Sequence, residues 1–253
     1  MKTSAEGARA PSCEPDRSES LAARIAAVDW HRIQMELDAR GCAVLQGLLT
    51  ARECRALIGC YREDHLFRST IDMARHGFGR GEYRYFDYPL PPTVASLRAH
   101  LYAHLAPIAN GWNRSLRIAT RYPDTHEAYL ARCHRDGQTR VTPLLLRYTE
   151  GDYNCLHQDL YGEHVFPMQV TFLLSEPAED FTGGQFVLTE QRPRMQSRAE
   201  VVELALGDGV LFPVHHRPVA SKRGGCRANL RHGVSRLRSG ERYTAGIIFH
   251  DAR

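Results

Sequence analysis

Two histidines and one aspartate have the types and spacing that a redox-active metal site requires. His157 and Asp159 are separated by one residue at the end of a strand-like run, and His232 follows much later in the chain. Alternate residues of a strand share a face, so His157 and Asp159 can bind one metal while Gln158 points away. Two imidazoles and one carboxylate leave coordination positions open, which suits ferrous iron and O2 chemistry. A satisfied core or turn histidine is the alternative for His232.

An arginine and two hydroxyl-bearing residues extend this pattern. Arg242 lies ten residues after His232, at the expected start of the last strand. Its planar guanidinium can pair with a carboxylate through two hydrogen bonds, so a dicarboxylate co-substrate could lie between it and the metal. Thr244 shares the strand face of Arg242 and could add a hydroxyl, and Tyr148 is a candidate phenol donor. A surface position for Arg242 and a packing role for Tyr148 are the alternatives.

The elements that must position these residues divide the chain into three parts. Residues 1–19 are polar, and we expect a disordered tail. Residues 20–140 indicate a layer of helices with short strands, in which Thr50 and Glu53 form a capping-box pattern and Gly41 ends the preceding helix. Residues 141–253 contain many short strands separated by glycine-rich turns, which is typical of a β-sandwich or barrel and forms the expected catalytic core.

The expected elements can be given as ranges. We predict helices at about 21–40, after Thr50, from Pro92 to about Ala109 and at 125–133, with loops at 67–80 and 215–218. The predicted strands are Cys42–Leu49, Glu82–Tyr88, Pro143–Thr149, Met168–Ser175, Gln185–Glu190, Val201–Leu206, Val210–Val214, Cys226–His232 and Tyr243–Phe249.

Composition limits the cellular setting. The seven cysteines are scattered and contain no CxxC pair, which favours reduced thiols. No apolar run approaches membrane-spanning length and the N-terminus has no apolar signal core, so we expect a cytoplasmic protein without a membrane partner. The net charge of +4 is mild, but arginines are dense between residues 217 and 242. This density favours an anionic partner or is a solvated basic surface.

The ordered motifs resemble those of a known superfamily. They are Tyr148-x-x-Gly151-x-Tyr153-x-x-x-His157-x-Asp159, Phe181-Thr-Gly-Gly184, Gly207-Asp-Gly-Val-Leu-Phe212 and His232 followed by Ser239-Gly-Glu-Arg242-Tyr-Thr. From Leu144 to His250 the chain resembles the 2-oxoglutarate/Fe(II)-dependent dioxygenases, and its motifs are nearest to prolyl-hydroxylase-like members. The resemblance implies a mainly β fold, a double-stranded β-helix of the jelly-roll or cupin type with supporting N-terminal α-helices.

The resemblance also implies site roles and cofactors. His157, Asp159 and His232 would bind Fe(II), and Arg242 would bind the distal carboxylate of 2-oxoglutarate. O2 is the second co-substrate, and ascorbate is a supporting reductant. The whole chain further resembles a little-characterised bacterial group of these oxygenases that is associated with oxidative repair of alkylated DNA. The terminal Arg-x-Asn-x-Thr-Phe-Arg pattern of the alkylated-DNA repair enzymes is absent, and the last strand follows the prolyl-hydroxylase pattern.

Several functional alternatives follow. The expected reaction hydroxylates a C–H bond and releases succinate and CO2. The sequence favours a protein or amino-acid side chain as substrate, with an alkylated nucleobase as the alternative. A cupin-like metal-binding protein without turnover and a zinc hydrolase are rivals, although the hydrolase would leave Arg242 without a role. His164 could face substrate or belong to a turn, His215 and His216 fit a pocket rim, and the oligomeric state is not indicated.

Overall fold

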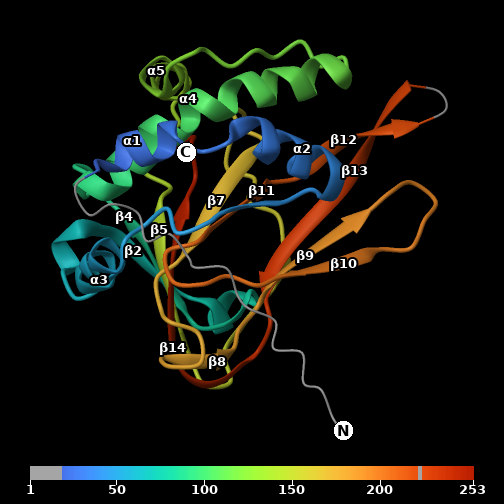
Figure 1. Ribbon diagram of the computed structural model, residues 1–253. Helices are drawn as coiled ribbons and strands as arrows, with labels where there is room; N and C mark the ends of the chain where they lie inside the picture. The colour runs from blue at the N-terminus through green and yellow to red at the C-terminus, as the bar shows by residue number, and fades with distance from the viewer. Residues whose placement is uncertain (1–18, 222–223) are drawn as a thin grey trace, which may run out of the picture.

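A computed structural model describes residues 19–221 and 224–253 (Figure 1). The predicted disordered tail therefore lies, apart from Glu19, outside the described residues. Within the described ranges, none of the helices combines the length and the apolarity needed to cross a bilayer.

The described residues form five α-helices, and local signals explain several of their ends. The predicted first helix is divided into two, because Asp29 caps a new start by accepting a hydrogen bond from the backbone of Arg32. Gly41 ends the second helix in the left-handed conformation, and Thr50 and Glu53 form the predicted capping box. The helices are α1 Leu21–Ala26, α2 Trp30–Arg40, α3 Ala51–Cys60, α4 Pro92–Ser115 and α5 His126–Arg135.

The strands form two antiparallel sheets. The larger has the order β1-β11-β7-β14-β5-β4-β2, with β8 paired to β14, and the smaller has the order β10-β9-β13-β6-β3, with β12 paired to β13. This arrangement confirms the predicted double-stranded β-helix. The strands are β1 Ala43–Leu45, β2 Phe67–Asp72, β3 Gly79–Arg80, β4 Glu82–Phe86, β5 Leu144–Thr149, β6 Tyr153–His157, β7 Met168–Leu173, β8 Phe181–Gly183, β9 Phe186–Gln191, β10 Arg198–Val202, β11 Gly209–Pro213, β12 His216–Ser221, β13 Gly224–Val234 and β14 Leu237–Ile247.

Two predicted loops are wrong, and a third prediction is shifted. Residues 67–72 form β2, which pairs with β4 at the edge of the larger sheet. Residues 216–221 form β12, which pairs with β13 and buries Arg217 against Glu190. Both strands lie at the edge of a sheet, and neither segment has the alternation of apolar and polar residues on which strand prediction relies. The strand predicted at 201–206 lies instead at 198–202.

The apolar core decides which residues face the interior between the sheets. On β7, Met168, Val170 and Phe172 pack into the cluster formed with α1, α2, α4 and α5, while the alternate residues line a cavity on the other face. Ala245 and Ile247 of β14 likewise join the helix-side core, and Thr244 and Gly246 line the cavity. Figure 1 shows α1, α4 and α5 gathered on one side of the sheets. The helical layer thus fixes which face of each strand is free to form a site.

Candidate metal centre

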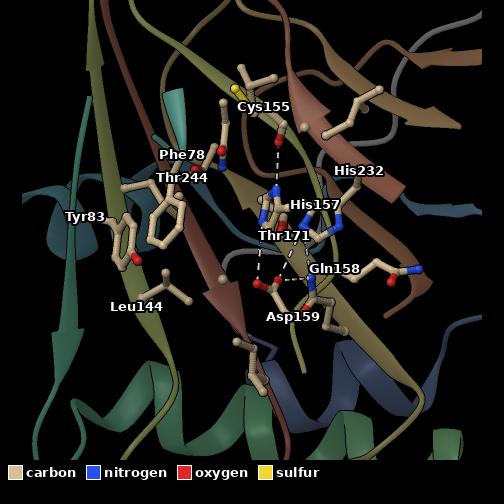
Figure 2. A pocket seen from close by; sticks show the side chains of 18 of the residues that line it. Phe78, Tyr83, Leu144, Cys155, His157, Gln158, Asp159, Thr171, His232 and Thr244 are labelled. Carbon is tan, nitrogen blue, oxygen red and sulfur yellow. Dashed lines mark hydrogen bonds and ion pairs between the residues drawn. The ribbon is translucent and has the colours of Figure 1, made fainter. Parts of the chain in front are cut away.

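His157, Asp159 and His232 converge between the two sheets (Figure 2). His157 ends β6, and β13 pairs with it in a register that places His232 directly opposite. One potential ligand atom from each of the three residues lies within 4.8 Å of the others. The Nε2 atoms of His157 and His232 lie 3.4 Å and 3.3 Å from the two Asp159 oxygens. Gln158 points away, as predicted, and donates to the backbone carbonyl of Leu230.

Hydrogen bonds set the orientation of these groups. His157 Nδ1 lies 2.8 Å from the carbonyl oxygen of Cys155 and donates to it, which leaves the lone pair of Nε2 facing Asp159 and His232. Asp159 accepts hydrogen bonds from Tyr161 Oη at 2.8 Å and from Gln169 Nε2 at 2.7 Å. Each oxygen of the carboxylate therefore has one side-chain donor.

The charge states suit a cation. Burial would raise the pKa of Asp159, but the hydrogen bonds and charges of His157 and His232 hold it well below its usual value. Burial lowers the pKa of His232, and contact with Asp159 offsets this only in part. Burial also acts to lower the pKa of His157, yet the hydrogen bond and charge of Asp159 raise it overall. An ionised carboxylate and a neutral imidazole, His232, are the protonation states in which such groups bind metals.

Arg242 is the second notable group. It is 2% exposed, and its Nε and Nη1 atoms have no hydrogen-bond partner among the described residues. Burial lowers its pKa to about 10. Tyr148, its register partner on β5, lies beside it with the ring centroid 5.6 Å from the guanidinium carbon. The buried Tyr148 hydroxyl also has no hydrogen-bond partner in the described part of the chain. Unpaired buried donors around a cation fit a carboxylate ligand.

The metal ligands open into a cavity of about 420 Å³. Its wall includes five of the six predicted site residues, together with apolar and aromatic side chains from both sheets: Phe78, Tyr83, Tyr85, Leu144, Leu146 and Phe186. Arg242 lines an adjoining cavity of about 360 Å³, and Phe186 belongs to both walls. The structure thus brings Tyr148 and Thr244 to the metal cavity and places Arg242 next to it.

The remaining predicted histidines lie elsewhere. His164 Nε2 forms a hydrogen bond with the Asp136 carboxylate and is not part of the cavity wall. His215 and His216 contact each other, and His215 lines a groove on the smaller sheet whose wall shares Leu156 and Gln158 with the metal cavity. Tyr161 and Gln169 were missed by sequence reasoning. The available signal was Gln169 itself, a polar residue between the apolar residues Met168 and Val170 of β7.

Comparison with known proteins identifies the family. Residues 81–252 match the family model Oxygenase-NA, described as "Oxygenase, catalysing oxidative methylation of damaged DNA". The chain belongs to this family. Two Mycobacterium tuberculosis proteins, both described as uncharacterised, are 50% identical to this Oxygenase-NA chain over 167 residues, covering 66% of it and 72% of each relative.

Solved structures support the fold of this Oxygenase-NA protein. A Pseudomonas putida prolyl-4-hydroxylase is 17% identical with a TM-score of 0.51, covering 88% of this chain and 99% of its own. A Trichoplax adhaerens prolyl hydroxylase, solved with a hypoxia-inducible-factor peptide, is 15% identical with a TM-score of 0.51, covering 92% and 93%. The family, the fold and the His-Asp-His cluster confirm the predicted dioxygenase class, for which the cofactors are Fe(II), 2-oxoglutarate and O2.

Proposed function

We propose that the protein hydroxylates a C–H bond of its substrate in a reaction that consumes 2-oxoglutarate and O2 and releases succinate and CO2. The observation that carries the proposal is the buried His157–Asp159–His232 cluster in a cavity that adjoins the unpaired Arg242. Three protein ligands leave coordination positions for co-substrate and oxygen. A zinc hydrolase would use the same three ligands but would leave the buried guanidinium without a partner.

Different side chains would bind the metal and the co-substrate. His157, Asp159 and His232 would hold the metal, which when bound supplies the oxidant through reaction of 2-oxoglutarate with O2. Arg242 would pair with the distal carboxylate of 2-oxoglutarate, and the hydroxyls of Tyr148 and Thr244 would donate to the same ligand. The aromatic and aliphatic wall would limit the access of water to the reacting groups and so strengthen these polar contacts.

The test is succinate formation by purified protein supplied with Fe(II), 2-oxoglutarate, ascorbate and O2. We expect iron-dependent succinate release even without the substrate, and its loss together with bound metal in His157→Ala. His31→Ala, at an exposed histidine, is the matched control and should behave as wild type. Stoichiometric Fe(II) retained by His157→Ala would rule out the proposed ligand set, and absence of succinate under every condition would favour a cupin-like binding protein.

For the substrate we propose an alkylated base carried on nucleic acid. The family description names damaged DNA, and exposed arginines lie on the strand that carries His232. Arg227 and Arg231 are exposed on β13, and Arg231 lines a groove of about 410 Å³ whose wall shares Leu156 and Gln158 with the metal cavity. Such cations fit phosphate contacts beside the site.

Salt dependence tests this substrate class. Single-stranded DNA should bind with an affinity that falls as salt rises, and Arg231→Gln should reduce the log–log slope by roughly 0.7. Arg55→Gln, at an exposed arginine on α3, is the matched control. DNA binding without salt dependence, together with hydroxylation of a protein in a lysate, would favour the protein side chain that the sequence motifs suggested.

A further inference from the structure

Gln169 occupies an unusual position in the wall of the metal cavity. It lies on β7 between Met168 and Val170, which pack toward the helices, so its side chain turns toward the metal ligands. It is 3% exposed, and its Nε2 donates to Asp159 Oδ2 at 2.7 Å and lies 3.2 Å from His232 Nε2. A residue of the larger sheet thus contacts Asp159, in the loop that follows β6, and lies beside His232 of the smaller sheet.

The contact with Asp159 leaves the other end of the Gln169 amide without a hydrogen bond among the described residues. The carboxylate fixes the orientation of the amide, because a carbonyl oxygen facing Asp159 would be repelled. The Oε1 atom is consequently buried with no donor among the described residues. An unsatisfied buried carbonyl destabilises a protein, and a methionine would fill a similar space without it. Stability alone therefore does not explain a glutamine here.

Tyr161 makes the matching contact with the other oxygen of Asp159. Its hydroxyl donates to Oδ1 and accepts from Tyr85 on β4 at 3.1 Å. The loop that carries Tyr161 is held by Gln138. The Nε2 atom of Gln138 donates to the carbonyl oxygen of Tyr161, and its Oε1 atom accepts hydrogen bonds from the backbone amides of Glu163 and His164. Gly162 permits this approach, because a Cβ there would lie 2.6 Å from Gln138 Cδ.

We propose that Gln169 and Tyr161 are positioning residues that hold the Asp159 carboxylate in the orientation needed for one metal ion. A carboxylate attached to a loop can rotate about its side-chain bonds. One donor on each oxygen removes that freedom and leaves the edges facing His157 and His232 for the metal. The inference rests on the proposed metal-binding function and adds two residues to it.

Co(II) binding tests the inference without turnover or O2. We would titrate wild type, Gln169→Met and Tyr161→Phe with Co(II), measure affinity from the visible absorption of the bound ion, and measure the melting temperature of each metal-free protein. Each variant should bind Co(II) roughly 10–100-fold more weakly. Metal-free Gln169→Met should melt no lower than wild type, because its unsatisfied carbonyl is gone.

The controls separate this inference from the proposed function. Tyr243→Phe removes a phenol from β14 at a position outside the cavity wall, where the ring packs against Tyr61, so its Co(II) affinity should be unchanged. If wild type fails to bind Co(II), the proposed metal site itself is wrong. If wild type binds, His157→Ala does not, and both variants bind within twofold of wild type, the positioning role alone is overturned. Should Gln169→Met fail to fold, Tyr161→Phe decides the outcome.

Discussion

Replacing Arg242 by methionine should change co-substrate binding and stability in opposite directions. The guanidinium is 2% exposed, and two of its nitrogen atoms have no partner among the described residues. Burying an unpaired guanidinium costs solvation free energy, and a bound carboxylate ligand would offset that cost. Methionine removes the charge and occupies much of the same space. The metal-free protein therefore no longer carries the solvation cost of a buried guanidinium, whereas the protein with bound 2-oxoglutarate loses the contact between Arg242 and the co-substrate.

The structure gives the approximate size of both effects. Burial lowers the pKa of Arg242 from 12.5 to about 10, which corresponds to about 3 kcal/mol of lost solvation. The rings of Tyr148 and Phe181, at 5.6 Å and 5.8 Å, return about 1 kcal/mol through cation–π contact. Arg242→Met should therefore stabilise the ligand-free protein by about 1–2 kcal/mol, a rise in melting temperature of roughly 2–8 °C. Two lost charge-assisted hydrogen bonds cost 2-oxoglutarate about 3 kcal/mol, or more than 100-fold in Kd.

Thermal unfolding with and without 2-oxoglutarate measures both effects on Co(II)-loaded and metal-free protein. At 100 times the wild-type Kd, 2-oxoglutarate should stabilise wild type by about 2.7 kcal/mol and leave Arg242→Met almost unchanged. Arg238→Met, at an exposed position of the same strand, is the control and should respond like wild type. The reasoning is refuted if Arg242→Met binds 2-oxoglutarate normally, or if its metal-free form melts several degrees below wild type.

Three further outcomes are expected. Asp251→Ala should lower the free energy of unfolding, measured in urea, by about 3–5 kcal/mol. The reason is that Arg98 pairs with Asp251 at 2.6 Å, both side chains are almost fully buried, and the substitution leaves the Arg98 charge unpaired. An unchanged urea midpoint would contradict this. Burial lowers the pKa of His126 to about 4, so only the unfolded chain gains its proton between pH 6.5 and pH 4, and stability should fall by up to about 3 kcal/mol across that range. Melting curves should show a smaller fall for His126→Gln, and an equal fall would remove His126 as a cause. Gly184→Ala should raise the KM for 2-oxoglutarate by about tenfold or more with unchanged Co(II) affinity. The reason is that Gly184 has a φ of +61° and that a Cβ on this residue would lie 3.0 Å from Arg242 Cδ. An unaltered KM would count against that packing.

Local chemistry in the sequence predicted the end of α2, the start of α3 and most strands of the core, whereas α4 continues to Ser115 and does not end near Ala109 as predicted. The capping box at Thr50 and Glu53 and the left-handed Gly41 depend on residues close in the chain, and both were found where expected. Strand alternation placed His157 and Asp159 on one face, with Gln158 turned away. These features are local because hydrogen bonds between near neighbours and strand geometry determine them.

Edge strands and the supports of the site did not follow from local pattern. β2 and β12 are edge strands, and neither sequence shows the alternation of apolar and polar residues that indicates an extended conformation. Gln169 contacts Asp159 only because β7 of the larger sheet packs against the residues that follow β6, and no spacing within β7 encodes that approach. Tyr161 lies two residues after Asp159, and the direction of its side chain depends on the loop that Gln138 holds.

The sequence by itself determined the residue types, their order and the face of each strand on which they lie, because these depend on covalent geometry and near neighbours. Only the tertiary structure decided that His232 stands opposite His157, through the register of β13 on β6. It also decided that Arg242 is buried, with two of its nitrogen atoms unpaired among the residues that the structure describes, and that it lines the cavity adjoining the metal ligands. Register and burial depend on the packing of the two sheets and the helical layer together, so residues far apart in the chain acquire their chemistry only in the folded protein.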